Sequence, residues 1–204
     1  MAIGEKSRRL AITGMLAAIL IVLGVTPLGF VPIGPAKATT MYLPVIVGAI
    51  LEGPVVGLVL GLVFGLFSLF QAMTAPSLLS PIFIEGWFFV AILPRLCIGP
   101  LACLAYRGVL RLFRGKEAPA AAGGAILGAL TNTVLVLGAI CLLYGSKFAE
   151  LMGMEMQAVL PAVLGIAIAN GLPEAALSAL VVTPIVMAAR HAVPFYRRKN
   201  NEKA

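Results

Sequence analysis

The sequence has no aspartate, a single histidine and few charged residues of any kind. Only 11% of its 204 residues are charged, whereas 61% are hydrophobic, and the mean hydropathy is +1.06. So few charges cannot cover the surface of a soluble domain, so lipid must surround most of the chain. No long hydrophilic stretch marks a second domain. The composition predicts one membrane domain over residues 1–204.

Several motifs of catalysis and energy coupling are also missing. The chain contains no GxxxxGK[ST] loop for ATP phosphates and no HExxH zinc motif. An intramembrane serine protease needs a buried Ser–His pair, but the only histidine, His191, lies beside the basic C-terminal tail. Cys97, Cys103 and Cys141 lie in apolar runs without CxxC or CxxH spacing, so we expect small core residues. We expect no enzyme, no self-powered pump, no metal and no cofactor.

The basic excess does not indicate a nucleic-acid partner. The formal net charge is +7 at pH 7, but the basic residues form short clusters between apolar runs. Anchoring of helices at the cytoplasmic membrane surface explains such clusters fully. We therefore expect these basic residues to contact the lipid bilayer and not a nucleic acid.

The first apolar run, residues 10–25, follows three basic residues and therefore resembles a signal peptide. The run is long for the hydrophobic part of such a peptide. The small-x-small pattern at 36–38, which would serve for cleavage, lies far beyond its end. We expect a retained first transmembrane helix.

Apolar runs of the length that a bilayer crossing needs recur along the chain. A crossing helix takes about 20 mostly apolar residues. The predicted spans are residues 10–28, 38–51, 55–73, 84–104, 120–144 and 158–189. The second is short for a full crossing unless it is tilted or partly buried in protein. The sequence thus predicts an all-α, polytopic bundle of six transmembrane helices.

Charge sets the expected orientation. Cytoplasmic segments of membrane proteins carry the excess of lysine and arginine. With the N-terminus inside, only Lys37 and Lys147 fall in outer loops and only Arg95 lies at membrane depth. The inner segments hold Lys6, Arg8, Arg9, Arg107, Arg111, Arg114, Lys116, Arg190, Arg197, Arg198, Lys199 and Lys203. Both termini are therefore predicted to be cytoplasmic.

Four polar residues lie near the middle of predicted spans: Arg95, Asn132, Asn170 and Glu174. Ionisable groups at this depth are costly, so they face a cavity or pair with each other. Asn170 and Glu174 share a helix face at i and i+4. One interpretation is an Arg95–Glu174 ion pair that holds the bundle together, with the two asparagines forming hydrogen bonds between helices. The other is a ligand pocket, and the two are compatible.

Small residues repeat at four-residue spacing on two spans. Ala11, Gly14 and Ala18 share a face of the first span, and glycines 57, 61 and 65 share a face of the third. Such faces allow close approach of helix backbones. Packing within the chain and docking to another membrane protein both remain open.

The segment before the second span is rich in proline and glycine and ends in Thr39 and Thr40. A loop of this kind can fold over a pocket as a lid. Thr39 can equally cap the start of the second span. The sequence does not choose between these roles.

Four stretches that follow one another along nearly the whole chain are informative together: FVPIGPAKATTMYLPVIVGAILEGPVVGLVLGLVFGLFSLFQA (30–72), ILPRLCIGPLACLAYR (92–107), TNTVLVLG (131–138) and NGLPEAALSALVVTPI (170–185). In these stretches and in their order, the chain resembles the substrate-binding S-components of energy-coupling factor (ECF) vitamin transporters. Among these it is most similar to the pantothenate-type subgroup.

The resemblance implies a passive capture subunit in a prokaryotic cell membrane. Such a protein binds a vitamin or precursor from outside, in a pocket formed by the first loop and spans four to six. It then docks onto a transmembrane coupling subunit that two cytoplasmic ATPase subunits drive, and topples to release its cargo. Family members dock through a small-residue patch on the first span, which here would be Ala11, Gly14 and Ala18.

The four polar residues fit the pocket that this resemblance implies. Arg95 would hold a ligand carboxylate, because a planar guanidinium can donate two parallel hydrogen bonds to the two carboxylate oxygens. Asn132 and Asn170 would bond hydroxyl or amide groups. Glu174 would orient Arg95 or accept a bond from a ligand hydroxyl.

The outer side of the pocket would be closed by Trp87 and by Thr39, Thr40 and Tyr42. Only 7% of residues are aromatic, which disfavours a flat, stacked vitamin. Pantothenate, a hydroxylated amide with one carboxylate, fits this set of groups, as do other small carboxylates. A self-sufficient secondary transporter would show repeated halves with broken helices, which are not evident, and a structural membrane factor is the remaining alternative.

Overall fold

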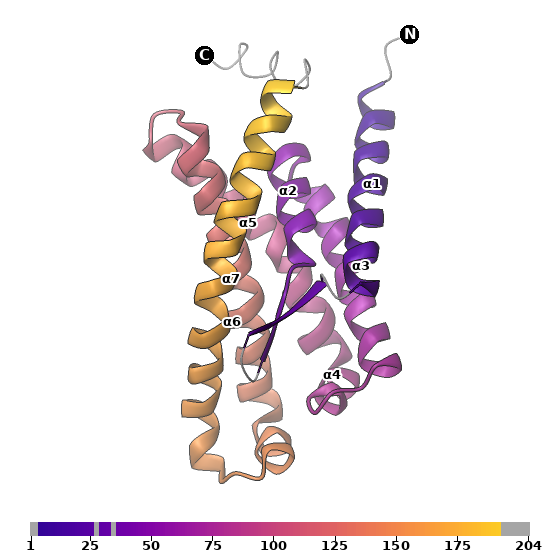
Figure 1. The fold of residues 1–204 in the computed structure, drawn as a ribbon, viewed down its shortest axis with the longest axis vertical. Coiled ribbons are helices and arrows are strands. Elements are labelled where there is room, and N and C mark those ends of the chain that lie inside the picture. The colour runs from indigo at the N-terminus through magenta and orange to yellow at the C-terminus, as the bar shows by residue number, and fades with distance from the viewer. Residues whose placement is uncertain (1–3, 27–28, 34–35, 193–204) are drawn as a thin grey trace.

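The computed structural model describes residues 4–26, 29–33 and 36–192, and its elements form an elongated helical bundle (Figure 1). The elements are α1 (Glu5–Val25), β1 (Phe30–Ile33), β2 (Ala36–Thr39), α2 (Tyr42–Glu52), α3 (Pro54–Thr74), α4 (Ser80–Glu85), the π-helix η2 (Trp87–Ile92), α5 (Leu93–Leu112), α6 (Glu117–Met152) and α7 (Met156–Ala192). The start of α1 and the end of α7 lie at the same end of the bundle (Figure 1).

Five helices in the described part of the chain are long and apolar enough to cross a membrane. They are α1, α3, the continuous η2–α5 segment, α6 and α7. The predicted second span, 38–51, is the exception, because α2 has only 11 residues and the preceding residues belong to β2. Nine of its 11 residues are buried. Surrounding helices shield α2 from lipid, so this helix does not need the length of a lipid-exposed span.

The outer surface of the long helices is apolar. Leu142, Leu180 and Val25 are all more than 70% exposed. A soluble monomer does not display such a surface over its whole length. Lipid is therefore the medium that covers these side chains, as the composition predicted.

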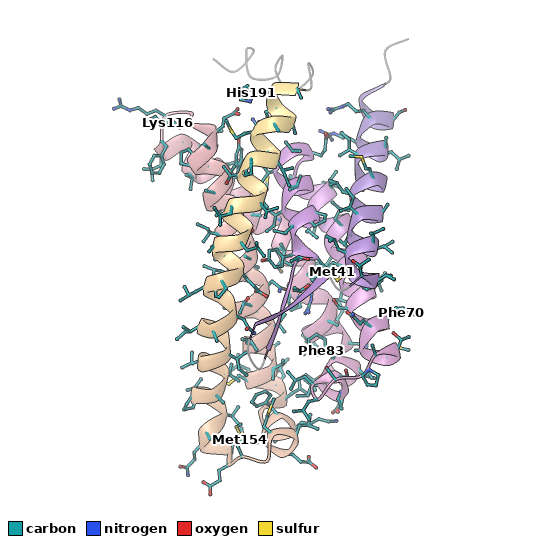
Figure 2. The ribbon with its side chains drawn as sticks, in the orientation of Figure 1. Met41, Phe70, Phe83, Lys116, Met154 and His191 are labelled. Carbon is teal, nitrogen blue, oxygen red and sulfur yellow. The ribbon has the colours of Figure 1, made fainter. Side chains whose placement is uncertain are left out.

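Charged groups gather at the two ends of the bundle. Lys116 and His191 lie at the end that holds the start of α1 and the end of α7, and Met154 marks the opposite end (Figure 2). At the first end, Glu52 pairs with Arg8 and Arg9, at 3.3 and 3.6 Å. These ion pairs join α1 to α2.

The segment between α1 and α2, which the sequence predicts as a loop, contains a two-stranded antiparallel hairpin. Phe30 pairs with Thr39 and Ile33 with Ala36. The hairpin runs beside the middle of the bundle, against α7 (Figure 1). It is the one departure from the predicted all-α fold among the described residues, and it delivers Thr39 directly to the start of α2.

The glycines of α3 pack inside the chain. A Cβ at Gly61 would collide with the Arg95 carbonyl, and one at Gly65 would lie 3.0 Å from the Ala91 carbonyl. Gly57 meets Gly99 of α5 in the same way. Of the two roles predicted for this stripe, the structure therefore supports packing, and the close approach brings the backbone of residues 91–99 against α3.

Candidate ligand-binding site

Arg95 lies at the start of α5, directly after the π-helix, and is only 6% exposed. Its guanidinium donates from Nη1 to the backbone carbonyl of Val90. The same group lies over the rings of Phe64 and Phe83, 5.4 and 5.3 Å from their centroids. Aromatic faces attract a cation, so these two rings help to hold the guanidinium inside the protein. Nε is buried and has no hydrogen-bond partner among the described residues.

Glu174 joins four elements through hydrogen bonds. The backbone N–H of Thr39, at the end of β2, donates to its Oε1 over 3.2 Å. The Thr133 hydroxyl of α6 donates to its Oε2 over 2.8 Å. The Tyr42 hydroxyl of α2 donates to the Glu174 backbone carbonyl over 3.0 Å. Both carboxylate oxygens are thus bonded to protein donors, and the hairpin is tied to α6 and α7.

The predicted Arg95–Glu174 pair does not form as an ion pair in the described part of the chain. Arg95 bonds instead to Val90, and Glu174 to Thr39 and Thr133. The bundle is therefore not held together at this depth by a direct salt bridge between these residues.

Asn132 and Asn170 lie next to the groups that surround Glu174. Asn132 precedes Thr133 on α6, and Asn170 lies one turn before Glu174 on α7. The Oδ1 atoms of both asparagines are buried and have no hydrogen-bond donor within the described residues. A buried acceptor without a donor is costly. Both side chains are thus suited to accept bonds from hydroxyl or amide groups of a ligand.

The three loop residues of the predicted site meet where β2 passes into α2. Tyr42 is fully buried, and Thr40 is nearly so. The Thr39 hydroxyl accepts the N–H of Met41 over 3.3 Å while its own N–H binds Glu174. Thr39 is not the cap of α2, because the N-cap residue is Met41 and no side chain caps this helix. Its backbone N–H attaches the hairpin to α7 through Glu174, and its role in a lid stays a prediction.

Trp87 is not brought together with these residues. It begins the π-helix, is 52% exposed and stacks edge-on with Phe88, with ring centroids 5.7 Å apart. Across the described residues, no hydrogen bond or ring contact joins it to Arg95 or Glu174. Its place in the pocket wall stays a prediction.

The small-residue face of α1 lies on the outside of the bundle. Ala11, Gly14 and Ala18 are all exposed, and apart from its own turn of helix no described atom lies within 4 Å of a Cβ added at Gly14. Only 17% of the most apolar stretch of α1 is buried. The face is accessible to a partner or to lipid.

Among the described residues, the buried polar atoms without a hydrogen-bond partner include Nε of Arg95 and Oδ1 of Asn132 and Asn170. Chemically, the first matches a carboxylate and the other two match hydroxyl or amide donors. In the same part of the chain, no group of three or more His, Cys, Asp or Glu side chains could hold a metal ion.

Comparison with known proteins identifies relatives of the whole bundle. A family model described as the substrate-specific component of ECF transporters matches residues 8–186. The chain is 34% identical over 167 residues to the pantothenic acid transporter PanT of Lactococcus lactis subsp. cremoris (strain MG1363), covering 76% of this chain and 78% of that protein. It is 30% identical over 112 residues to the pantothenate transporter PanT of Leuconostoc mesenteroides subsp. mesenteroides (strain ATCC 8293), covering 52% of this chain and 54% of that protein.

Proposed function

This chain belongs to the substrate-specific components of ECF transporters, and from that membership we propose that it captures pantothenate outside the cell for import. The names of two similar proteins support this ligand. The observation that carries the proposal is the buried Arg95 guanidinium, which has a donor without a partner. Pantothenate supplies one carboxylate for that donor, and its amide and hydroxyl groups supply bonds for the asparagines.

Each polar residue has a distinct role in this proposal. Arg95 binds the carboxylate through the edge of the guanidinium that carries Nε, because Nη1 already bonds Val90. Asn132 and Asn170 accept bonds from the ligand. Glu174 holds the hairpin in place, and the ordered hairpin then limits escape of the ligand.

Three further residues complete the proposed site from the outer side. Thr40 and Tyr42 lie where the hairpin passes into α2, and both are buried. Trp87 is half exposed at the start of the π-helix. In this proposal it borders the entrance, with no direct bond to the ligand.

We place six spans in a prokaryotic cell membrane, with α2 as a short, buried sixth span and both termini cytoplasmic. The shared end of α1 and α7 supports this orientation (Figure 1). The basic residues near that end, such as Lys116, support it as well (Figure 2). The hairpin and the α6–α7 connection then belong to the outer half.

Import needs partners, because the sequence holds no phosphate-binding loop. A transmembrane coupling subunit and two ATPase subunits are the partners that membership of this family implies. The exposed face of α1, with Ala11, Gly14 and Ala18, is the docking surface that we assign to the coupling subunit.

The direct test is calorimetry on the purified, detergent-solubilised chain with a panel of vitamins. We expect one tight ligand at one-to-one stoichiometry, pantothenate, and much weaker binding of panthenol, in which a hydroxymethyl group replaces the carboxylate. Binding of a different small carboxylate would retain the capture function and change its substrate. No binding by folded protein would contradict the proposal, and accumulation in vesicles without the ATPases would indicate a self-sufficient transporter.

Glu174→Ala is expected to speed the dissociation of pantothenate by about tenfold or more, because the hairpin loses a hydrogen bond to a charged group. Glu174→Gln keeps an oxygen acceptor for the Thr39 N–H. Its amide NH2 can donate to the Thr133 hydroxyl, whose own proton then goes to the Ala129 carbonyl, so this variant should stay close to wild type. Stopped-flow or surface-based kinetics measure both rates. Equal, large losses in the two variants would mean that the charge of Glu174, and not its attachment of the hairpin, determines binding.

A further inference from the structure

We infer that Glu52 is a positioning residue for docking, because its ion pairs with Arg8 and Arg9 fix the rotation of α1 about its own axis. This inference rests on the proposed function, in which the exposed face of α1 receives the coupling subunit. The Glu52 side chain is only 1% exposed, so this residue acts on the docking face through α1.

The buried and the exposed faces of α1 lie on opposite sides of the helix. α1 stands at the edge of the bundle and packs against α2 and α3 (Figure 1). Among its described residues, the buried ones are Leu16, Leu20 and Gly24, at four-residue spacing. Gly14 and Ala18 lie two residues before and after Leu16, which is about 200° around the helix axis in either direction. The docking face therefore points away from the bundle only while the leucines point into it.

Apolar packing alone sets this rotation weakly in a bilayer. Lipid tails are as apolar as leucine, so moving a leucine from lipid into a helix interface gains no hydrophobic free energy. Only 17% of the most apolar stretch of α1 is buried, which limits its van der Waals contacts with α2 and α3. A polar contact between α1 and the bundle therefore has a large effect on the rotation.

Glu52, the last residue of α2, provides such a contact. Its Oε2 lies 3.3 Å from Nη2 of Arg8 and 3.6 Å from Nε of Arg9. The two arginines are neighbours on α1, about 100° apart, so one carboxylate holds the helix from two sides. Arg8 also continues the four-residue spacing of the buried face, eight residues before Leu16. A rotation that withdrew both arginines would leave a buried carboxylate unpaired, which is costly.

These ion pairs lie close to the docking face. Both arginines are within one helical turn of Ala11. At the other end of α1, Gly24 packs so closely on Phe67 of α3 that a Cβ would collide. Gly24 is about 20 Å along the helix axis from Ala11. Glu52 thus orients the half of α1 that begins the docking face, and the packing of Gly24 fixes the opposite half.

Removal of the Glu52 carboxylate should leave the capture site intact. α2 has 11 residues, so Glu52 lies about 15 Å along the helix axis from Tyr42 at its other end. The side chains of Arg8 and Arg9 are 18% and 45% exposed, so both can turn to water when the carboxylate is lost. Glu52→Leu therefore removes the ion pairs without leaving a charge buried.

Glu117 provides a matched control. Its Oε1 lies 2.9 Å from Nη1 of Arg190, and this ion pair joins α6 to α7. Glu117 follows Lys116, which lies at the same end of the bundle as the start of α1 (Figure 2). Glu117→Leu thus tests the general effect of removing an ion pair at this end, away from α1.

The experiment compares Glu52→Leu, Glu117→Leu and wild type in three measurements. Calorimetry gives the pantothenate affinity, and uptake of labelled pantothenate into cells that express the coupling subunit and ATPases reports docking. Spin labels at single cysteines along residues 10–21, in protein whose three cysteines are replaced by alanine, report oxygen accessibility in lipid vesicles. Accessibility varies with the helix period, so its phase measures the rotation of α1. Glu52→Gln, which keeps the shape of the side chain, replaces Glu52→Leu if that variant does not fold.

In wild type we expect the lowest oxygen accessibility at positions 12, 16 and 20. In Glu52→Leu this pattern should flatten or shift, and pantothenate uptake should fall about tenfold or more, the effect of losing hydrogen bonds between charged groups. Pantothenate affinity should stay unchanged. Glu117→Leu should alter none of these three results.

Several outcomes would overturn the inference. They are an unchanged accessibility pattern in Glu52→Leu, a shifted pattern with normal uptake, loss of pantothenate binding in Glu52→Leu, or an equal loss of uptake in Glu117→Leu. If wild type binds no pantothenate, the proposed function fails, and the accessibility comparison alone still decides whether Glu52 orients α1.

Discussion

Arg95→Ala is expected to weaken pantothenate binding by at least about thirtyfold, since truncating one partner of a buried charge pair costs about 2–5 kcal/mol. The carboxylate would lose a charge-assisted donor in a buried site. Arg95 is 6% exposed, so no neighbouring solvent can replace it. Calorimetry on the purified protein measures the change, with thermal unfolding as the check on folding.

Two further variants separate charge from geometry in this prediction. Arg95→Lys keeps the positive charge but loses the planar fork and its several donors. We expect it to bind more weakly than wild type and more strongly than the alanine variant. Arg107→Ala removes an exposed arginine from the same helix and should bind normally. Wild-type affinity in Arg95→Ala would show that the ligand carboxylate is held elsewhere.

The same truncation also tests the structural interpretation of Arg95. Without the guanidinium, the Val90 carbonyl loses its side-chain donor, so some loss of thermal stability is expected. If Arg95→Ala fails to fold while Arg95→Lys folds and binds pantothenate at wild-type affinity, the residue is chiefly structural. A folded alanine variant that does not bind supports the ligand role.

The long helices were predictable because their apolar runs are unbroken and of membrane length. The five helices that meet this criterion in the described chain correspond to five of the six predicted spans. The second predicted span is short in the structure and mostly buried, as its length allowed, because hydropathy does not distinguish a lipid-exposed helix from a short one covered by protein. The hairpin was missed for a related reason, since its pairing depends on packing against α7 and leaves no strong alternation in the sequence.

The polar set was predictable because charges and amides at membrane depth are few. The hydrogen-bond partners of these residues were not predictable. The sequence allowed Arg95 to pair with Glu174. In the structure, Arg95 instead donates a hydrogen bond to a backbone carbonyl, and Glu174 accepts hydrogen bonds from Thr39 and Thr133. Thr133 is adjacent to Asn132, but a threonine in a helix commonly bonds its own backbone, so it gave no signal.

The contacts of the two aromatic rings with Arg95 could not be predicted from the sequence. Phe64 and Phe83 lie in apolar runs where phenylalanine is ordinary. Phe64 approaches the guanidinium because the glycines of α3 allow that helix to pack closely on α5, and Phe83 reaches it from α4. Contacts between distant segments of this kind depend on the packed bundle and cannot be read from local pattern.

Gly14→Leu is expected to abolish pantothenate uptake by the assembled transporter while leaving binding by the isolated chain unchanged. No atom lies within 4 Å of a Cβ at this position, so the protein itself has room for leucine. A partner helix packed on Ala11, Gly14 and Ala18 would have none, because small residues permit close approach of the backbones. Uptake of labelled pantothenate into cells that express the coupling subunit and ATPases measures the first effect, and calorimetry the second.

Gly165→Leu is the matched control, because it adds the same side chain at another exposed glycine with open space around it, on α7. It should support normal uptake, since Gly165 lies on α7 and not on the face of α1 that we assign to docking. Ala18→Leu should reproduce the defect of Gly14→Leu, because the two positions share one helix face. Normal uptake in both α1 variants would exclude this face as the docking surface. Loss of pantothenate binding in either would place the defect in the capture site, because docking is absent from the calorimetric measurement.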